Sequence, residues 1–246
     1  MLDANQAKIK RLIEKGYSVY ITGKGGCGKS LFITSIIEEL RAKDICCFVT
    51  APTGKAANNI GGVTIHSFAG IGTGSKGAHE LISSIKANED ALSRWQTCEL
   101  LVIDEVSMLS RELFEKLEMI ARCLKKNSKP FGGIQLLLSG DVYQLKPVIP
   151  QSNVASEDAY CFASPMWTSC VDLSVMFDKN YRQHETGLID LLDDFRSSEV
   201  LSERSRHFIE NNLTRPLTCN PLKIVRLYAH KEIASQANDE CLALLP

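Results

Sequence analysis

Short runs of apolar residues alternate with amphipathic segments along the chain. Continuous apolar runs, rather than alternating ones, predict strands buried on both faces at residues 18–22, 45–51, 100–104 and 134–140. Between these runs, residues 31–40 and 111–126 carry apolar side chains at helical spacing. This order of strands and helices predicts an α/β fold with a doubly wound, mainly parallel sheet.

Two stretches lack such periodicity. Residues 54–77 hold seven glycines among Thr, Ser and Asn, and residues 147–158 show no repeating apolar pattern. We expect both to be loops, and loops of this length usually serve a function. Near the end, residues 224–229 predict one more strand, and the helical pattern that follows through Leu245 predicts one more helix.

Composition narrows the class of protein. With 246 residues and 44% apolar content, the chain suits one large domain or slightly more. Its nine cysteines form no CxxC pair, which favours reduced thiols and an intracellular protein. Residues 1–20 predict neither a signal peptide nor a membrane span. The net charge of -1 argues against a protein that coats nucleic acid, so any contact with DNA must be local.

One motif predicts a nucleotide site. The segment GKGGCGKS fits GxxxxGK[ST] and lies between the first predicted strand and helix. Glycines let backbone amides wrap a phosphate at a helix N-terminus, a lysine reaches further phosphate oxygens, and a serine hydroxyl binds Mg²⁺. We therefore predict ATP and Mg²⁺ as ligands, with the nucleotide held by Gly23, Gly25, Gly26, Cys27, Gly28, Lys29, Ser30 and Leu31.

Acidic and amide side chains follow two other predicted strands. Asp104 and Glu105 come directly after LLVI, where open α/β sheets place their ligands. Asp104 is a candidate Mg²⁺ ligand, and Glu105 is a candidate to orient and deprotonate the attacking water. Gln144 follows the strand IQLLLSG and is placed to sense a γ-phosphate, although a plain polar loop residue is an equally good interpretation from position alone.

Two other classes of nucleotide-binding protein fit poorly. The sequence holds no Asn-Lys-x-Asp element, which guanine recognition would need. The segment after Gly140 reads DVYQLKPVIP, and it lacks the arginines expected of a small-molecule kinase lid.

Several motifs together resemble the Pif-type (petite-integration-frequency) DNA helicases. GKGGCGKS, TAPTGKAA, TIHSFAGIG, LLVIDEVSML, KPFGGIQLLLSGDVYQLKPV and NYRQ occur in the order and spacing of that family, and the similarity runs from Leu2 to Leu245. The resemblance implies an ATP-driven motor that moves 5′-to-3′ on single-stranded DNA and acts on DNA forks. It also implies two RecA-like P-loop NTPase lobes with the nucleotide in the cleft between them.

The resemblance assigns further residues to the nucleotide. Arg182 of NYRQ matches an arginine that contacts the γ-phosphate, and Gln6 matches a glutamine that reads adenine. Without the resemblance, Arg182 would be read as a surface ion-pair residue and Gln6 as a helix-surface residue.

The resemblance to the Pif-type helicases also assigns candidate DNA contacts. Pro52, Thr53 and Lys55 of TAPTGKAA lie where the family holds DNA phosphates, and His66 and Phe68 of TIHSFAGIG lie where it meets bases or sugars. Burial of Phe68 in the core is an alternative that the residues alone leave open.

The expected organisation follows from the same resemblance. Residues 1–220 would form the ATP-binding RecA-like lobe, and residues 221–246 the first strand and helix of a second lobe. We expect a monomer, located in the nucleus or mitochondrion if the source is eukaryotic, and little activity from this chain alone. A nucleotide-switched DNA-binding adaptor and a non-helicase ATPase are the alternative functions.

Overall fold

The computed structural model describes residues 3–148, 159–197, 200–213 and 225–243. The chain divides into two compact units, Met1–His184 and Glu185–Pro246. The first unit contains the predicted nucleotide motifs.

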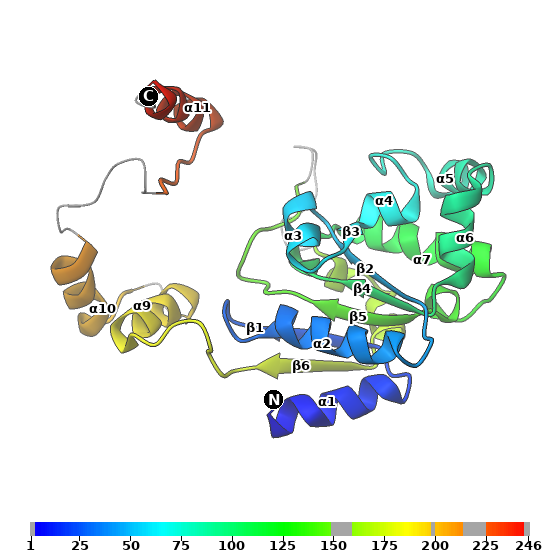
Figure 1. The fold of residues 1–246 in the computed structure, drawn as a ribbon, viewed down its shortest axis with the longest axis horizontal. Helices are drawn as coiled ribbons and strands as arrows, with labels where there is room; N and C mark the ends of the chain where they lie inside the picture. The colour runs from blue at the N-terminus through cyan, green and yellow to red at the C-terminus, as the bar shows by residue number, and fades with distance from the viewer. Residues whose placement is uncertain (1–2, 149–158, 198–199, 214–224, 244–246) are drawn as a thin grey trace. The chain divides into compact units, whose positions relative to one another are not determined.

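A six-stranded parallel sheet is the centre of the first unit (Figure 1). The strand order is β3-β2-β4-β5-β1-β6. The strands are β1 (Val19–Gly23), β2 (Cys47–Ala51), β3 (Val63–Thr64), β4 (Leu100–Ile103), β5 (Gln135–Ser139) and β6 (Leu173–Phe177). The four predicted strands and the parallel sheet are confirmed, whereas the edge strands β3 and β6 were not predicted, because a half-exposed edge strand carries no continuous apolar run.

Helices cover both faces of this sheet, as Figure 1 shows. On one face lie α1 (Ala4–Glu14), α2 (Lys29–Arg41) and α3 (Gly54–Asn59). On the other lie α4 (Ile65–Ala69), α5 (Ala78–Lys86), α6 (Glu89–Thr97), α7 (Arg111–Lys125) and α8 (Trp167–Cys170), together with the 3-10 turns Val106–Met108, Pro130–Gly133 and Cys161–Ala163. The doubly wound α/β class is therefore confirmed.

Strand β4 shows how the two cores form. Leu100 and Val102 pack with the α1 and α2 side, whereas Leu101 and Ile103 pack with α7. Successive residues of a strand point to opposite faces, and helices cover both faces, so all four side chains are fully buried. Continuous apolar sequence is what a strand covered on both faces requires.

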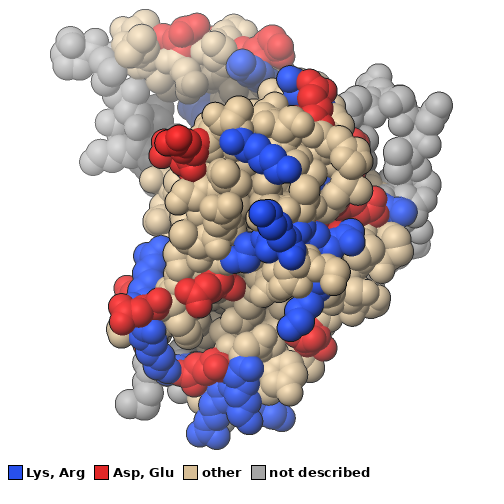
Figure 2. All heavy atoms as spheres, turned by 90° about the vertical axis from the view of Figure 1, so that its right-hand side faces the viewer, with Lys and Arg blue, Asp and Glu red and all other residues tan. Residues whose placement is uncertain are grey.

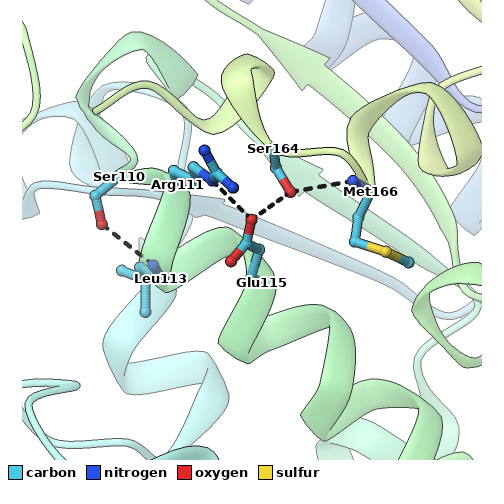
Figure 3. A network of polar contacts seen from close by, with 6 residues as sticks. All are labelled: Ser110, Arg111, Leu113, Glu115, Ser164 and Met166. Atoms are coloured by element: carbon cyan, nitrogen blue, oxygen red, sulfur yellow. Dashed lines mark hydrogen bonds and ion pairs between the residues drawn. The ribbon is translucent and has the colours of Figure 1, made fainter. Parts of the chain in front are cut away.

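Polar contacts fix the start of α7 against the segment before α8 (Figure 3). Ser110 caps α7 by accepting a hydrogen bond from Leu113 N at 3.2 Å. The Glu115 carboxylate accepts hydrogen bonds from Arg111 Nε at 2.9 Å and from Ser164 Oγ at 2.8 Å. Ser164 Oγ in turn accepts a bond from Met166 N at 3.2 Å, so one carboxylate joins two segments.

The predicted loop at residues 54–77 contains more regular structure than expected. It includes α3, β3 and α4, and the side chains of Thr53 and Thr64 cap the two helices. These elements are too short for a periodic pattern to reveal them. The predicted loop at residues 147–158 lies mostly outside the described residues.

The described part of the second unit is mainly helical. It contains α9 (Thr186–Ser197), α10 (Glu203–Phe208), a π-helical turn (Ile209–Leu213) and α11 (Lys231–Leu242). Helix α11 confirms the predicted last helix. The predicted strand at 224–229 is wrong over its described part, because residues 225–228 form no strand and both Val225 and Leu227 are exposed.

The expected domain boundary at residues 220 and 221 lies outside the described residues. None of the described helices is long and apolar enough to cross a membrane.

Phe114 of α7 gives a direct test of the core. Its ring is fully buried and lies 5.3 Å from the ring of Phe131 and 5.6 Å from that of Trp167. We expect Phe114→Ala to lower the free energy of unfolding by about 3–5 kcal/mol, because it leaves a cavity. Met119→Ala, on the exposed side of the same helix, should change it by less than about 1 kcal/mol. Equal effects of the two variants in urea unfolding would contradict this packing.

Candidate nucleotide site

The loop between β1 and α2 has a backbone that only glycine adopts easily. Gly23, Gly26 and Gly28 have φ values of 140°, 86° and 82°. A Cβ at Gly23 would lie 2.2 Å from the carbonyl oxygen of Phe177, and one at Gly26 would lie 2.6 Å from Cβ of Arg182. Gly28 is the N-cap of α2, so the loop amides and the helix N-terminus lie together, as a phosphate site requires.

Lys29 lies over this loop. Its Nζ donates hydrogen bonds to the carbonyl oxygens of Gly23 at 2.7 Å and Lys24 at 3.0 Å. The same nitrogen is 3.6 Å from Sγ of Cys27. These contacts hold the ammonium group at the loop, within reach of a phosphate that occupies it.

Ser30, near the start of α2, contacts Asp104, which directly follows the carboxyl end of β4. Ser30 Oγ donates a hydrogen bond to Asp104 Oδ2 at 3.1 Å, and the Asp104 side chain is buried. Among the described residues, no group of three or more His, Cys, Asp and Glu side chains could hold a metal ion. A hydroxyl and one carboxylate nevertheless fit Mg²⁺, which prefers oxygen ligands and usually takes its others from phosphates and water.

Glu105 has an unusual backbone. Its φ of 51° and ψ of 42° place it in the left-handed region, and its N–H donates to Asp104 Oδ1 at 3.0 Å. Burial raises the pKa of the Glu105 carboxyl, nearby Asp104 adds to the rise, and Lys29 opposes it. This raised proton affinity makes Glu105 a stronger base than an exposed glutamate.

A pocket of about 280 Å³ brings these groups together. It is lined by the loop from Gly25 to Leu31 and by Glu105, Gln144, Tyr181 and Arg182. Gln144 is held by its Nε2, which donates to Asp141 Oδ2 at 3.1 Å. Arg182 is exposed, and its N–H donates to Asn180 Oδ1 at 2.9 Å.

A second pocket of about 660 Å³ adjoins the loop on the α1 side. Its lining is Gln6, Lys10, Gly28, Leu31, Phe32, Ser35, Glu39 and Tyr181. Gln6 is buried, and its Oε1 accepts a hydrogen bond from Asp3 N at 3.1 Å. Tyr181 lines both pockets but was missed from the sequence, although it stands beside Arg182 in NYRQ.

The candidate DNA residues lie after β2 and in α4. Pro52 and Thr53 are half-buried, and Thr53 Oγ1 accepts from Ala56 N at 3.2 Å as the cap of α3. Lys55 is exposed. His66 is half-buried, and burial lowers the pKa of its imidazole, so the ring is mainly neutral at pH 7.

The expectation that Phe68 meets DNA bases or sugars is wrong. Its side chain is fully buried, with its ring centroid 5.0 Å from that of Phe48 and 5.0 Å from that of Trp95. Ile65 and Ala69 of the same short helix are buried with it. The alternative, that Phe68 is a core residue, is therefore correct, because this face of α4 packs into the hydrophobic core on one side of the sheet.

Surface charge agrees with local rather than broad contacts. On the face shown in Figure 2, Lys and Arg side chains are interspersed with Asp and Glu.

Comparison with known proteins identifies the family. The family model described as PIF1-like helicase matches residues 1–197. The chain belongs to the PIF1-like helicases. Among curated relatives, the ATP-dependent DNA helicase PIF1 of Saccharomyces cerevisiae is 38% identical over 250 residues and that of Homo sapiens 35% over 245. Both alignments cover 100% of this chain but only 28% and 37% of the relatives, so the chain spans a minor part of their length.

Solved PIF1-like structures share this fold. Pif1 helicase from Candida albicans matches with a TM-score of 0.89 and 38% identity, over 100% of this chain and 55% of that one. Bacteroides Pif1 in complex with ADP-AlF3 and single-stranded DNA matches with a TM-score of 0.80 and 26% identity, over 100% and 58%. The RecA-like P-loop fold that the sequence predicts is therefore confirmed.

The strained backbone at Glu105 gives a prediction that separates fold from chemistry. A side chain at positive φ is unfavourable, so we expect Glu105→Gly to be about 1 kcal/mol more stable than Glu105→Ala. Urea unfolding of the two variants measures the difference. In an ordinary extended or helical segment the alanine variant would be the more stable one, and that order would contradict the left-handed geometry.

Proposed function

We propose that this chain is the ATP-binding part of a DNA helicase that couples ATP hydrolysis to 5′-to-3′ movement on single-stranded DNA. The observation that carries the proposal is the small pocket at the sheet edge, where the phosphate loop, Glu105, Gln144 and Arg182 meet. Family membership supports it, because curated relatives that match 96% and 100% of the chain are ATP-dependent DNA helicases. A Bacteroides relative binds single-stranded DNA in a solved structure.

In the proposed mechanism the loop binds the triphosphate. Backbone amides from Gly25 to Ser30 surround the phosphates, and Lys29 exchanges its carbonyl contacts for phosphate oxygens. Ser30 and Asp104 would hold Mg²⁺, which neutralises phosphate charge when bound. Glu105 orients a water molecule for attack on the γ-phosphorus and accepts its proton. As the new P–O bond forms, the bond from the γ-phosphorus to the β–γ bridging oxygen breaks, and ADP and inorganic phosphate are released.

Two further side chains report on the γ-phosphate in this proposal. Gln144 faces the loop, since its Nε2 lies 3.7 Å from the position of a Cβ on Gly25. Its amide therefore senses whether the γ-phosphate is present. Arg182 spreads positive charge over the transition state, as a guanidinium does well.

We further propose that the pocket is one wall of a cleft between two RecA-like lobes. The chain spans 28% of the S. cerevisiae relative, which leaves room in such proteins for a second lobe. In this proposal residues 1–220 belong to the first lobe and residues 221–246 to the start of the second. Stabilisation of the negative charge in the transition state then requires groups from both lobes, so this chain alone hydrolyses ATP slowly. Single-stranded DNA and DNA forks are the proposed partners, in the nucleus or mitochondrion of a eukaryote.

Lys29 provides the central test. In the longest form of the protein that contains this chain, single-stranded DNA should stimulate ATP hydrolysis. Lys29→Ala should lower the stimulated rate by about 100-fold or more, because it removes a charged phosphate contact. Lys86→Ala, an exposed lysine of α5, is the matched control and should leave the rate unchanged. Hydrolysis that DNA does not stimulate would favour a non-helicase ATPase. Stimulated hydrolysis without any movement on DNA would favour a nucleotide-switched adaptor.

Lys55 tests the proposed DNA contact. If its exposed ammonium group binds one DNA phosphate, Lys55→Ala should weaken single-stranded DNA binding and lower the slope of log K against log salt concentration by about 1. The measurement is fluorescence anisotropy at several salt concentrations, again with Lys86→Ala as control. An unchanged slope would show that Lys55 does not contact a DNA phosphate.

A further inference from the structure

Tyr181 connects the two pockets of the nucleotide site. Its N–H donates to the carbonyl oxygen of Gly26 at 2.9 Å, which fixes its backbone to the phosphate loop. Its ring lies against Gly28, where a Cβ would be 3.4 Å from Cδ2. The Lys179 ammonium lies 5.0 Å from the ring centroid. The ring is therefore held beside the loop from more than one side.

Asp3 joins this tyrosine to the helix that carries Gln6. One carboxylate oxygen of Asp3 accepts from Gln6 N at 2.8 Å and caps α1, while Asp3 N donates to Gln6 Oε1 at 3.1 Å. The other oxygen accepts a hydrogen bond from the Tyr181 hydroxyl at 2.9 Å. A single carboxylate thus serves both the helix cap and a residue far away along the chain.

The electrostatics of the pair agree with a charged acceptor. The Gln6 N–H and then the Tyr181 hydroxyl lower the pKa of Asp3, while the hydrogen bond to Asp3 raises the pKa of Tyr181. Asp3 is therefore ionised and Tyr181 protonated at neutral pH, which is the arrangement that this hydrogen bond needs.

We propose that Asp3 and Tyr181 form a tie that positions the N-terminal end of α1 against the phosphate loop, and that binding of the adenosine part of the nucleotide depends on it. The inference rests on the proposed function. Asp3 and the Tyr181 hydroxyl act here as positioning groups.

The geometry explains why the tie matters for the base end of the pocket. The C-terminal half of α1 is fixed by Ile9 and Ile13, which are buried in the core with α2. Gln6 lies nearer the other end, and its amide is oriented by the cap, so its Nε2 is 3.9 Å from the position of a Cβ on Gly28. Because the tie joins the cap to the loop, its loss lets Gln6 shift away from Gly28. The phosphate-binding amides are not part of the tie and keep their places.

The test uses two conservative variants of the 246-residue chain. Asp3→Ser keeps a good N-cap, but its side chain is too short to reach Tyr181. Tyr181→Phe keeps the ring and removes only the hydroxyl. The control is Tyr17→Phe, because Tyr17 is an exposed tyrosine outside both pockets. We titrate the two single variants, the double variant and the control with Mg²⁺-ATP and with inorganic tripolyphosphate. Thermal unfolding of each variant confirms that it is folded.

We expect each single variant to weaken ATP binding by about three- to tenfold, a modest change because the hydrogen bond is solvent-accessible. The double variant should be no weaker than the single ones, since both remove the same bond. Tripolyphosphate binding should stay within about twofold of the wild type, and Tyr17→Phe should bind both ligands normally.

Three results would overturn the tie. These are unchanged ATP binding in both single variants, additive losses in the double variant, or an equal loss for tripolyphosphate, which would place the effect on the loop itself. A wild-type chain that binds neither ligand would instead contradict the proposed function, and the tie with it. If the wild type binds both ligands normally and the variants bind like it, the tie is contradicted and the proposed function is not.

Discussion

Burial of a parallel sheet on both faces is the constraint on which the rest of this structure depends. Strands β4 and β5 are covered by helices on either side, so the side chains of β4 and of the middle of β5 are apolar in both directions. Because every strand runs the same way, all the carboxyl ends meet at one edge of the sheet. Polar groups are placed there, and the phosphate loop, the acidic pair and Gln144 follow three strands that are neighbours in space.

The carboxyl ends of these strands also concentrate energetically unfavourable features. Glu105 has a left-handed backbone, and Asp104 and Asp141 are buried carboxylates beside it. Such strain and charge persist only where the surrounding fold fixes them. Here the sheet and its two cores provide that rigidity. Lys29 and any bound cation add the positive charge that makes the cluster of carboxylates useful for phosphate chemistry.

The sequence predicted those parts whose signal is local. The phosphate loop between a buried strand and a helix needs only spacing and glycines, and Asp104 needs only an apolar strand before it. The contact between Asp3 and Tyr181 depends on tertiary structure, so no local pattern could reveal it. Phe68 was misassigned because a motif gives a residue's place along the chain but not the face of its helix. The edge strand β6 was missed because half-exposure leaves its apolar pattern weak.

A crystal structure of this chain with Mg²⁺ and a non-hydrolysable ATP analogue tests directly whether the loop between β1 and α2 binds the nucleotide. We expect the β- and γ-phosphates within the loop from Gly23 to Ser30, with Lys29 Nζ moved from the carbonyl oxygens of Gly23 and Lys24 onto phosphate oxygens. The ion should lie beside Ser30 and Asp104, with the base next to Gln6. A nucleotide bound elsewhere, or one bound with Lys29 still on those carbonyl oxygens, would contradict the proposed nucleotide site.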